Sequence, residues 1–221
     1  MTNKAYILRY VLLKIAVEEF KIKDIIPSEH KLADKFSIGR ITVHNAYEIL
    51  KVLGIISPIQ GSGFYVTKTI DEYINPIFAR LYHFTDRIRY EQFAINYLIE
   101  DRRFSHALRV SLYDKQKNLM GMSYFFLNRF IESDRLSDVH INMAKILLDC
   151  GIDDFFNVET TISFQNREIY GNMLPLGQIK EDVPVVVIKL YNTENKLQAI
   201  IVTHLTKKYL LIEEHKKFNN I

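Results

Sequence analysis

The sequence predicts an α+β protein with two domains, an N-terminal winged helix-turn-helix domain and a C-terminal domain built on an antiparallel sheet. Two observations support this fold class. Up to Leu53, apolar residues recur at the 3.6-residue spacing of α-helices, and a pair of strands with a glycine-rich tip follows. From about Thr85 the sequence changes to runs rich in strand-forming residues. We therefore expect the first domain at residues 1–69, a linker at 70–84 and the second domain at 85–221.

Composition indicates a globular protein of the cytoplasm. Of the 221 residues, 48% are hydrophobic and 25% are charged, which is the usual balance of a soluble domain. No apolar run is long enough to span a bilayer, and Lys4, Arg9 and Lys14 interrupt the apolar stretch that a signal peptide would need. The single Cys150 cannot form an internal disulfide, so nothing points to an oxidising compartment.

The first three expected elements are helices. Residues 4–20 carry one apolar face, which should pack behind the two helices that follow. Ser28 is a good N-cap for the second helix, and Pro27 suits the position just before a helix start. The segment 37–39 then breaks the helical period, and Gly39 can adopt a backbone conformation that is closed to other residues. A third helix follows and ends at Gly54.

The outward face of the third helix has the chemistry needed to read base edges in a major groove. Near the start of that helix it carries Arg40, Thr42, His44 and Asn45. Arg40 is the first candidate for a base contact, because a guanidinium can bind guanine O6 and N7 together. Thr42 suits a phosphate or a thymine methyl group, and a neutral His44 offers one donor and one acceptor.

Residues on either side complete the predicted DNA interface. The small and basic side chains of the second helix and the turn are candidate phosphate contacts, which set register and do not read sequence. Strands at 55–60 and 64–67 form a hairpin whose glycines let the backbone approach a minor groove without a Cβ clash. The candidate DNA-binding residues are Ser28, Glu29, Lys31, Ser37, Arg40, Thr42, His44, Asn45, Gly61, Ser62 and Gly63.

This set of motifs resembles the DNA-binding domain of GntR-type bacterial regulators. The resemblance is carried by Pro27-Ser28-Glu29 with Leu32-Ala33, by Arg40-x-Thr42-Val43 with Ala46, by Leu50 through Gly54-Ile55-Ile56, and by Gly61-x-Gly63-x-x-Val66. These elements cover about one quarter of the chain in the order and spacing of the family. The resemblance implies a winged helix-turn-helix that binds DNA.

Charge is distributed unevenly along the chain. Residues 1–70 contain ten Lys or Arg and six Asp or Glu, a net charge of +4, whereas the rest contains nineteen and twenty, a net charge of −1. A small basic domain beside a nearly neutral one indicates a surface that binds a polyanion. A solvated surface explains the same counts about equally well, so charge supports the DNA interface without deciding it.

The second domain is expected to be a sheet with one helix. Strand-like runs fall at 90–98, 107–113, 119–127, 158–170, 184–191 and 197–205. Residues 139–150 indicate a helix that Gly151 ends. The run 184–191 is almost continuously apolar and should be a central strand, and together with 197–205 it suits either a core or a sheet shared between two chains.

This second half resembles UTRA, the effector-binding domain of the HutC-type branch of GntR regulators. The similar features are a strand with Arg109, a polar hairpin, a helix that ends at Gly151, Glu159 opening a strand, and Pro184-Val185 before a closing hairpin. The resemblance implies an antiparallel sheet flanked by helices, similar to chorismate lyase. It also implies an effector pocket that contains Arg109, Ser111, Ser123, Glu159 and Tyr209. Ser111 stands where a second arginine is common, and the segment 84–109 is shorter than usual.

Together these features lead us to expect a DNA-binding transcriptional regulator, more often a repressor in this family, and not an enzyme. It should bind a two-fold symmetric DNA operator as a homodimer, because one reading helix contacts too few bases for specificity. Arg109 and Glu159 favour a small polar or anionic effector such as a sugar or sugar phosphate. No cofactor or metal is expected, since the seven histidines lack the spacing of a metal site.

Two other functions are compatible with the sequence. A second domain that has lost its effector pocket would leave a DNA-binding dimer in which that domain serves only dimerisation or protein interaction. An enzyme of chorismate-lyase type tethered to DNA would need a catalytic set, and the sequence has no Gly-x-Ser-x-Gly, phosphate-loop or Rossmann motif. Ligand screening separates the first of these from an effector-controlled regulator.

Overall fold

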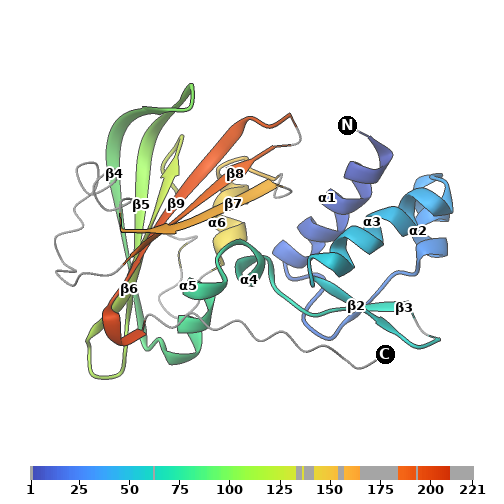
Figure 1. Ribbon diagram of the computed structural model, residues 1–221, viewed down its shortest axis with the longest axis horizontal. Helices are drawn as coiled ribbons and strands as arrows, with labels where there is room; N and C mark the ends of the chain where they lie inside the picture. Colours follow the sequence, from blue (N-terminus) through green and yellow to red (C-terminus); the bar gives the residue numbers. More distant parts are fainter. Residues whose placement is uncertain are drawn as a thin grey trace.

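The computed structural model describes residues 2–61, 63–132, 136, 142–153, 157–164, 184–192 and 194–209. They form a helical N-terminal part and a sheet-based C-terminal part, which lie side by side with short helices between them (Figure 1). In the described ranges no helix is both long and apolar enough to cross a membrane. The α+β fold class expected from the sequence is confirmed.

The N-terminal part is a cluster of three helices with a small antiparallel sheet against it. Its elements are α1 (Asn3–Ala16), β1 (Ile25–Ile26), α2 (Glu29–Phe36), α3 (Arg40–Val52), β2 (Ile56–Ile59) and β3 (Gly63–Val66). The strand order is β1-β3-β2, so the expected hairpin of β2 and β3 is present and β1 is an additional strand. The apolar stripes of the helices meet in a core that contains the fully buried Leu32, Tyr47 and Leu50.

The segment expected to be a linker is helical and packs against the sheet domain. It consists of α4 (Ile70–Ile74), α5 (Pro76–Arg80) and the 3₁₀ helix η1 (Leu81–Phe84). Thr69 and Glu72 form a capping box that starts α4, and Asn75 caps α5 ahead of Pro76. Phe78 is fully buried, so this segment is part of the core and does not simply span the gap between the two parts.

The C-terminal part is built on a six-stranded antiparallel sheet, as expected. Its elements are β4 (Arg87–Ile99), β5 (Arg102–Tyr113), β6 (Leu119–Leu127), α6 (Met143–Asp149), β7 (Asn157–Ser163), β8 (Val185–Tyr191), β9 (Leu197–Leu205) and the 3₁₀ helix η4 (Lys207–Tyr209). The strand order is β4-β5-β6-β9-β8-β7. β8 and β9 are both interior strands with a partner strand on each side. They therefore belong to the core of the sheet and cannot pair with a second chain. The edge strands of the sheet are β4 and β7.

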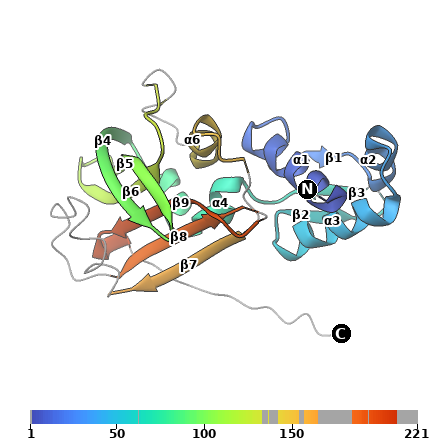
Figure 2. The same cartoon turned by 90° about the horizontal axis from the view of Figure 1, so that it is seen from above.

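The two faces of the sheet have different surroundings. The helices α4, α5 and α6 lie on one side, which we call the helix face (Figure 2). The other side is curved inward and is called here the concave face; its buried residues, which include Phe104, Met122 and Tyr124, form a separate apolar cluster. Glu100, in the tight turn between β4 and β5, contacts Lys189 and Tyr191 of β8, so distant strands approach each other across the concave face.

The two parts are joined by specific contacts as well as by the chain. Asn142, the N-cap of α6, donates a hydrogen bond to the carbonyl oxygen of Ala16 at the end of α1 (3.2 Å). Arg9 on α1 forms an ion pair with Asp153. One continuous apolar cluster runs from α1 through α4 to the helix face of the sheet. The N-terminal part is therefore seated on the sheet domain through α1, α4 and α6.

Candidate DNA interface and effector site

The turn between α2 and α3 differs from expectation in one respect. Ser28 caps α2 as expected, its Oγ accepting from the backbone N–H of Lys31 (3.3 Å). The left-handed residue of the turn is Ser37, with φ +52°, and Gly39 has an ordinary φ of −57°. The expectation that Gly39 supplies a conformation closed to other residues was therefore wrong. Gly39 is instead the N-cap of α3 and places no side chain there.

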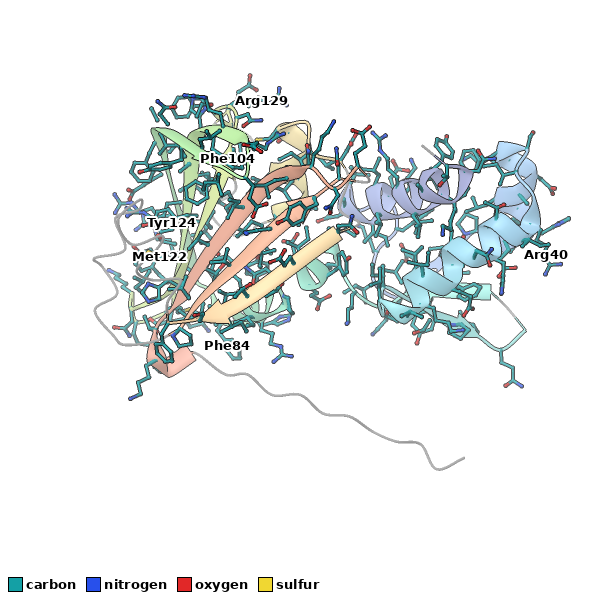
Figure 3. The ribbon with its side chains drawn as sticks, turned by 45° about the horizontal axis from the view of Figure 1, so that its top comes forward. Arg40, Phe84, Phe104, Met122, Tyr124 and Arg129 are labelled. Carbon is teal, nitrogen blue, oxygen red and sulfur yellow. The ribbon has the colours of Figure 1, made fainter. Side chains whose placement is uncertain are left out.

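Near its start, the outward face of α3 is polar apart from one residue. The side chains of Arg40 and His44 are 71% and 51% exposed, and Asn45 is also exposed, whereas Thr42 is half-buried. Arg40 points away from the sheet domain at the far end of the molecule (Figure 3). Ile41 lies among these residues and is 77% exposed, so a large apolar side chain is left in solvent on the same face. The sequence alone did not single out Ile41.

Glu29 has a different environment from the other candidate DNA contacts. Its carboxylate is only 14% exposed and lies at the start of α2, where it faces α3. It is 2.9 Å from His44 Nδ1 and 3.6 Å from Arg40 Nε. A carboxylate is an acceptor and repels phosphate, so the position of Glu29 suits it to orient the two candidate base-reading side chains.

Buried aromatic contacts hold the two helices and the hairpin together. Tyr47, on the inward face of α3, donates a hydrogen bond to the carbonyl oxygen of Pro27 just before α2 (2.5 Å). Its ring also packs edge-to-face against Phe64 of β3, with the ring centroids 5.1 Å apart. One side chain therefore fixes the positions of α2, α3 and the hairpin relative to each other.

The remaining candidates surround this reading face. Lys31 and Ser37 are exposed on α2 and at its end. The hairpin tip has the left-handed conformations that favour glycine, with φ +73° at Gly61 and +104° at Gly63. Ser62, the third residue of the predicted tip, lies outside the described residues.

Residues 6–66 match the family model described as bacterial regulatory proteins, gntR family. The chain carries a GntR-family helix-turn-helix domain. In that domain α2 and α3 form the helix-turn-helix, and β2 and β3 form the wing. The expected resemblance of the first domain to GntR regulators is confirmed.

Three solved structures with similarity to this chain are regulators by their descriptions. A GntR family transcriptional regulator from Listeria monocytogenes is 26% identical, over 38% of this chain and 75% of that one, with a TM-score of 0.32. The possible transcriptional regulator YydK from Bacillus subtilis is 13% identical over 98% and 100% of the two chains (TM-score 0.43). PhnF from Mycobacterium smegmatis is 14% identical over 95% and 100% (TM-score 0.37). Because these TM-scores are below 0.5, the family assignment depends on the match at residues 6–66.

In the second domain, Arg109 is a buried cation on the concave face. It is 6% exposed and forms an ion pair with Glu91 of β4, while Tyr124 Oη of β6 lies 3.5 Å from its Nη1. The guanidinium stands 5.5 Å from the centre of the Phe93 ring. Its Nε is shielded from solvent and has no hydrogen-bond partner among the described residues. Glu91 and Tyr124 were not among the residues expected from the sequence.

The strand register decides which other candidates share a face with Arg109. Arg109 pairs with Tyr124, and Ser111, which is 2% exposed, pairs with Met122, so all four lie on the concave face. Ser123 pairs with Val110 and faces the opposite way. On the helix face its Oγ is 2.5 Å from Thr203 Oγ1. The structure therefore does not bring Ser123 together with Arg109, contrary to the expected pocket.

Glu159 and Tyr209 complete the candidate effector residues. Glu159 is exposed on the edge strand β7, on the same face as Lys189, and accepts a hydrogen bond from Tyr191 Oη (3.4 Å). It shares the concave side with Arg109 but sits four strands away from β5. The side chain of Tyr209 lies outside the described residues. Among the residues that the structure describes, no group of three or more His, Cys, Asp or Glu is placed to hold a metal ion.

Proposed function

We propose that this protein is a transcriptional regulator that binds a two-fold symmetric operator as a homodimer, with α3 in the major groove and the wing along the minor groove. The observation that carries this proposal is the exposed face of α3, where Glu29 orients Arg40 and His44 inside a GntR-family domain. A single reading helix contacts only a few base pairs, which is why two copies are needed for specificity.

The residues divide into groups with different roles. Arg40, His44 and Asn45 contact base edges, and Thr42 contacts a phosphate or a base at the edge of the groove. Ile41 contacts a thymine methyl group, the apolar feature that a major groove offers to such a side chain. Ser28, Lys31, Ser37 and the wing tip at 61–63 contact phosphates or the minor groove and set the register.

The second domain is proposed to control DNA binding through a small polar or anionic effector, a sugar or sugar phosphate being favoured. The unsatisfied Nε of Arg109 supports this, because a buried donor without an acceptor costs about 1–3 kcal/mol and a ligand oxygen would remove that cost. Such a ligand would bind on the concave face beside Ser111 and Tyr124. Of the residues implied by the resemblance to the UTRA domain, Arg109, Ser111 and Glu159 lie on this face and Ser123 does not. Repression relieved by the effector is the mode we propose.

The ion pair between Arg109 and Glu91 supports a second candidate function. Because Arg109 already has an internal counter-charge, the concave face can be stable without a ligand. In that case the second domain would act only in dimerisation or protein interaction. Calorimetry of the full chain with glucose 6-phosphate, glucose and inorganic phosphate separates the two functions, since effector control requires saturable binding that Arg109→Ala weakens.

DNA binding is tested by titrating the full chain against a labelled fragment of its own promoter at several salt concentrations. Affinity should fall steeply with salt, because each contacted phosphate releases counterions. Light scattering of the same sample should give the mass of a dimer. Binding that is absent, or that is the same for promoter and scrambled DNA at all salt concentrations, contradicts the proposal.

A further inference from the structure

The outer end of the β4–β5 hairpin extends beyond the ladder that joins it to the rest of the sheet (Figure 1). The ladder between β5 and β6 ends at the pair of His106 and Leu127, whereas the ladder between β4 and β5 continues as far as Ile99. Within the described strands, residues 102–105 therefore pair only with β4. Residues 95–105 form a two-stranded segment, called here the outer ribbon. Two strands alone are only marginally stable, so the ribbon depends on the contacts that it makes with other elements.

An irregularity at the base of the outer ribbon provides a bending point. The register between β4 and β5 shifts between Ala94 and Tyr97, where β4 has one more residue than β5. Such a bulge bends the strand and interrupts the ladder locally. Asn128 lies beside this point: its backbone oxygen accepts from Ser105 Oγ (2.8 Å), and its amide, in the orientation that satisfies its neighbours, donates to the carbonyl oxygen of Arg103 (3.0 Å). The ribbon is therefore anchored at its base, next to the bulge.

The two faces of the outer ribbon have opposite surroundings. Ile95, Tyr97 and Ile99 pack against the apolar cluster of the concave face. The Tyr97 ring lies edge-to-face against Phe126 of β6, with the ring centroids 6.1 Å apart. On the other face Leu98 is 63% exposed. A single layer of the ribbon therefore covers this part of the concave cluster.

The tip of the outer ribbon is fastened to a strand that is not its neighbour in the sheet. Glu100 forms an ion pair with Lys189 of β8 and accepts a hydrogen bond from Tyr191 Oη (3.0 Å). In the strand order, β6 and β9 lie between β5 and β8. These contacts therefore cross the concave face and hold the ribbon closed over the apolar cluster.

The turn at the tip is not one that its sequence favours. Glu100 and Asp101 both have positive φ, +48° and +61°, as the two central residues of a type I′ turn do. Asn-Gly is the favoured pair for this turn, and a glutamate adopts the left-handed conformation at an energetic cost. The closed position of the tip therefore depends on the contacts of the Glu100 carboxylate with β8 and not on the preference of the turn.

We propose that the outer ribbon is a lid that opens and closes over the concave face, with the bulge as its hinge and Glu100 as its latch. The row of inward side chains begins at Phe93, whose ring is 5.5 Å from the Arg109 guanidinium. Opening of the lid therefore uncovers the concave cluster next to Arg109. Only the use of this motion rests on the proposed function: an effector enters while the lid is open and is covered when the lid closes.

Hydrogen–deuterium exchange of the full chain, followed by mass spectrometry of its peptides, tests the lid without any ligand. In the natural chain, amides of the outer ribbon should exchange faster than those of β6, because the lid opens while the sheet stays folded. Glu100→Asn keeps a residue that tolerates the left-handed conformation but removes the carboxylate. It should speed exchange in the ribbon about two- to fivefold and leave β6 unchanged. Lys189→Met removes the other side of the ion pair and should have the same effect.

Asp101→Asn is the matched control, because it removes one negative charge from the same turn and keeps the Glu100 carboxylate. It should exchange like the natural chain. Exchange in Glu100→Asn that is no faster than in Asp101→Asn would show that Glu100 is not a latch. Equal acceleration in the ribbon and in β6 would indicate a loss of global stability and no lid.

Exchange of the ribbon that is as slow as that of β6 in the natural chain would also overturn the proposal, since the lid would then open only when the whole sheet unfolds. None of these results depends on DNA binding or on an effector. Failure here is therefore distinct from failure of the proposed function.

Discussion

Asn75 donates a hydrogen bond from Nδ2 to Thr203 Oγ1 (2.8 Å), joining the segment between the domains to a strand 128 positions later in the chain. Both residues are fully buried. Thr203 Oγ1 is also 2.5 Å from Ser123 Oγ, and Asn75 Oδ1 accepts from the backbone N–H of Phe78. This chain of bonds fixes α4 and α5 to the middle of the sheet, on the face opposite Arg109.

We expect Asn75→Ala to destabilise the sheet domain by about 2–4 kcal/mol, because it removes a helix cap and a buried hydrogen bond to the Thr203 hydroxyl. Urea unfolding followed by circular dichroism measures the change. Asn45→Ala, at an exposed position on α3, is the matched control and should change stability by less than about 0.5 kcal/mol. A loss for Asn75→Ala as small as that of the control would show that the buried chain of bonds contributes little.

Arg40 and Lys31 should respond differently to the DNA sequence. Arg40→Ala should cost about 1–3 kcal/mol on the operator and much less on scrambled DNA, because it removes a base contact. Lys31→Ala should weaken binding to both DNAs about equally, because it removes a phosphate contact. Fluorescence anisotropy at one fixed salt concentration measures both ratios. Equal losses on the two DNAs for Arg40→Ala would identify Arg40 as a phosphate contact.

Glu29→Gln should lower specificity without lowering general affinity for DNA. Loss of the carboxylate releases Arg40 and His44, which should weaken operator binding about two- to fivefold, as expected from about 0.5–1 kcal/mol for a partly exposed ion pair. Binding to scrambled DNA should become slightly tighter, because a negative charge near the phosphates is removed. Glu48→Gln is the control, since Glu48 is paired with Lys51. If Glu29→Gln tightens binding to both DNAs equally, Glu29 has no orienting role.

Much of the fold could be predicted because local patterns decide it. The helical period of α3, the glycines of the wing and the alternation of β5 all depend on neighbouring residues. The strand β1 could not be found this way, because two residues carry no period and their pairing with β3 depends on tertiary structure. The helix α4 was missed although Thr69 and Glu72 have capping-box spacing, because a five-residue helix shows little apolar periodicity.

Which candidate site residues lie together on one face could not be predicted from the sequence. Arg109 and Ser123 are both odd-numbered and both fall in strands that alternate, yet they face opposite sides. Which residues share a face across two strands depends on the register, and the register depends on the loop and on bulges such as the one near Leu112. In the same way, the role of Glu29 depends on how α2 crosses α3, which no spacing along the chain specifies.

The pair of Glu91 and Arg109 should make stability depend on acid pH. The hydrogen bond from Arg109, together with the charges of Arg109 and Arg89, holds the pKa of Glu91 below its ordinary value of 4.5. A lowered carboxyl pKa contributes stability that is present above the unfolded value and is lost as pH falls through the folded value. The natural chain should therefore lose this contribution as the pH falls below about 4.5.

Glu91→Gln should lack that acid-dependent loss and should be less stable at neutral pH by about 1–3 kcal/mol, because the buried guanidinium loses its counter-charge. Urea midpoints measured between about pH 3 and pH 7 give both curves. Asp86→Asn, an exposed change just before β4, controls for the loss of one negative charge. If the urea midpoints of the natural chain and Glu91→Gln change with pH in parallel, the pair of Glu91 and Arg109 is not the cause of the acid-dependent loss of stability.

Ile41 should discriminate thymine from uracil in the operator. Replacing the contacted thymine by deoxyuridine removes only the methyl group, and its burial against Ile41 is worth about 0.8 kcal/mol, or about fourfold in affinity. The operator is first mapped by footprinting, and deoxyuridine then replaces one thymine in each half-site. The natural chain should bind this substituted operator about fourfold more weakly than the thymine operator. Ile41→Ala should bind the two operators equally. Val52→Ala removes the other strongly exposed apolar side chain of α3, 83% exposed at its far end, and should keep the full discrimination. A deoxyuridine penalty of the same size in Ile41→Ala and in the natural chain would show that another residue contacts the methyl group.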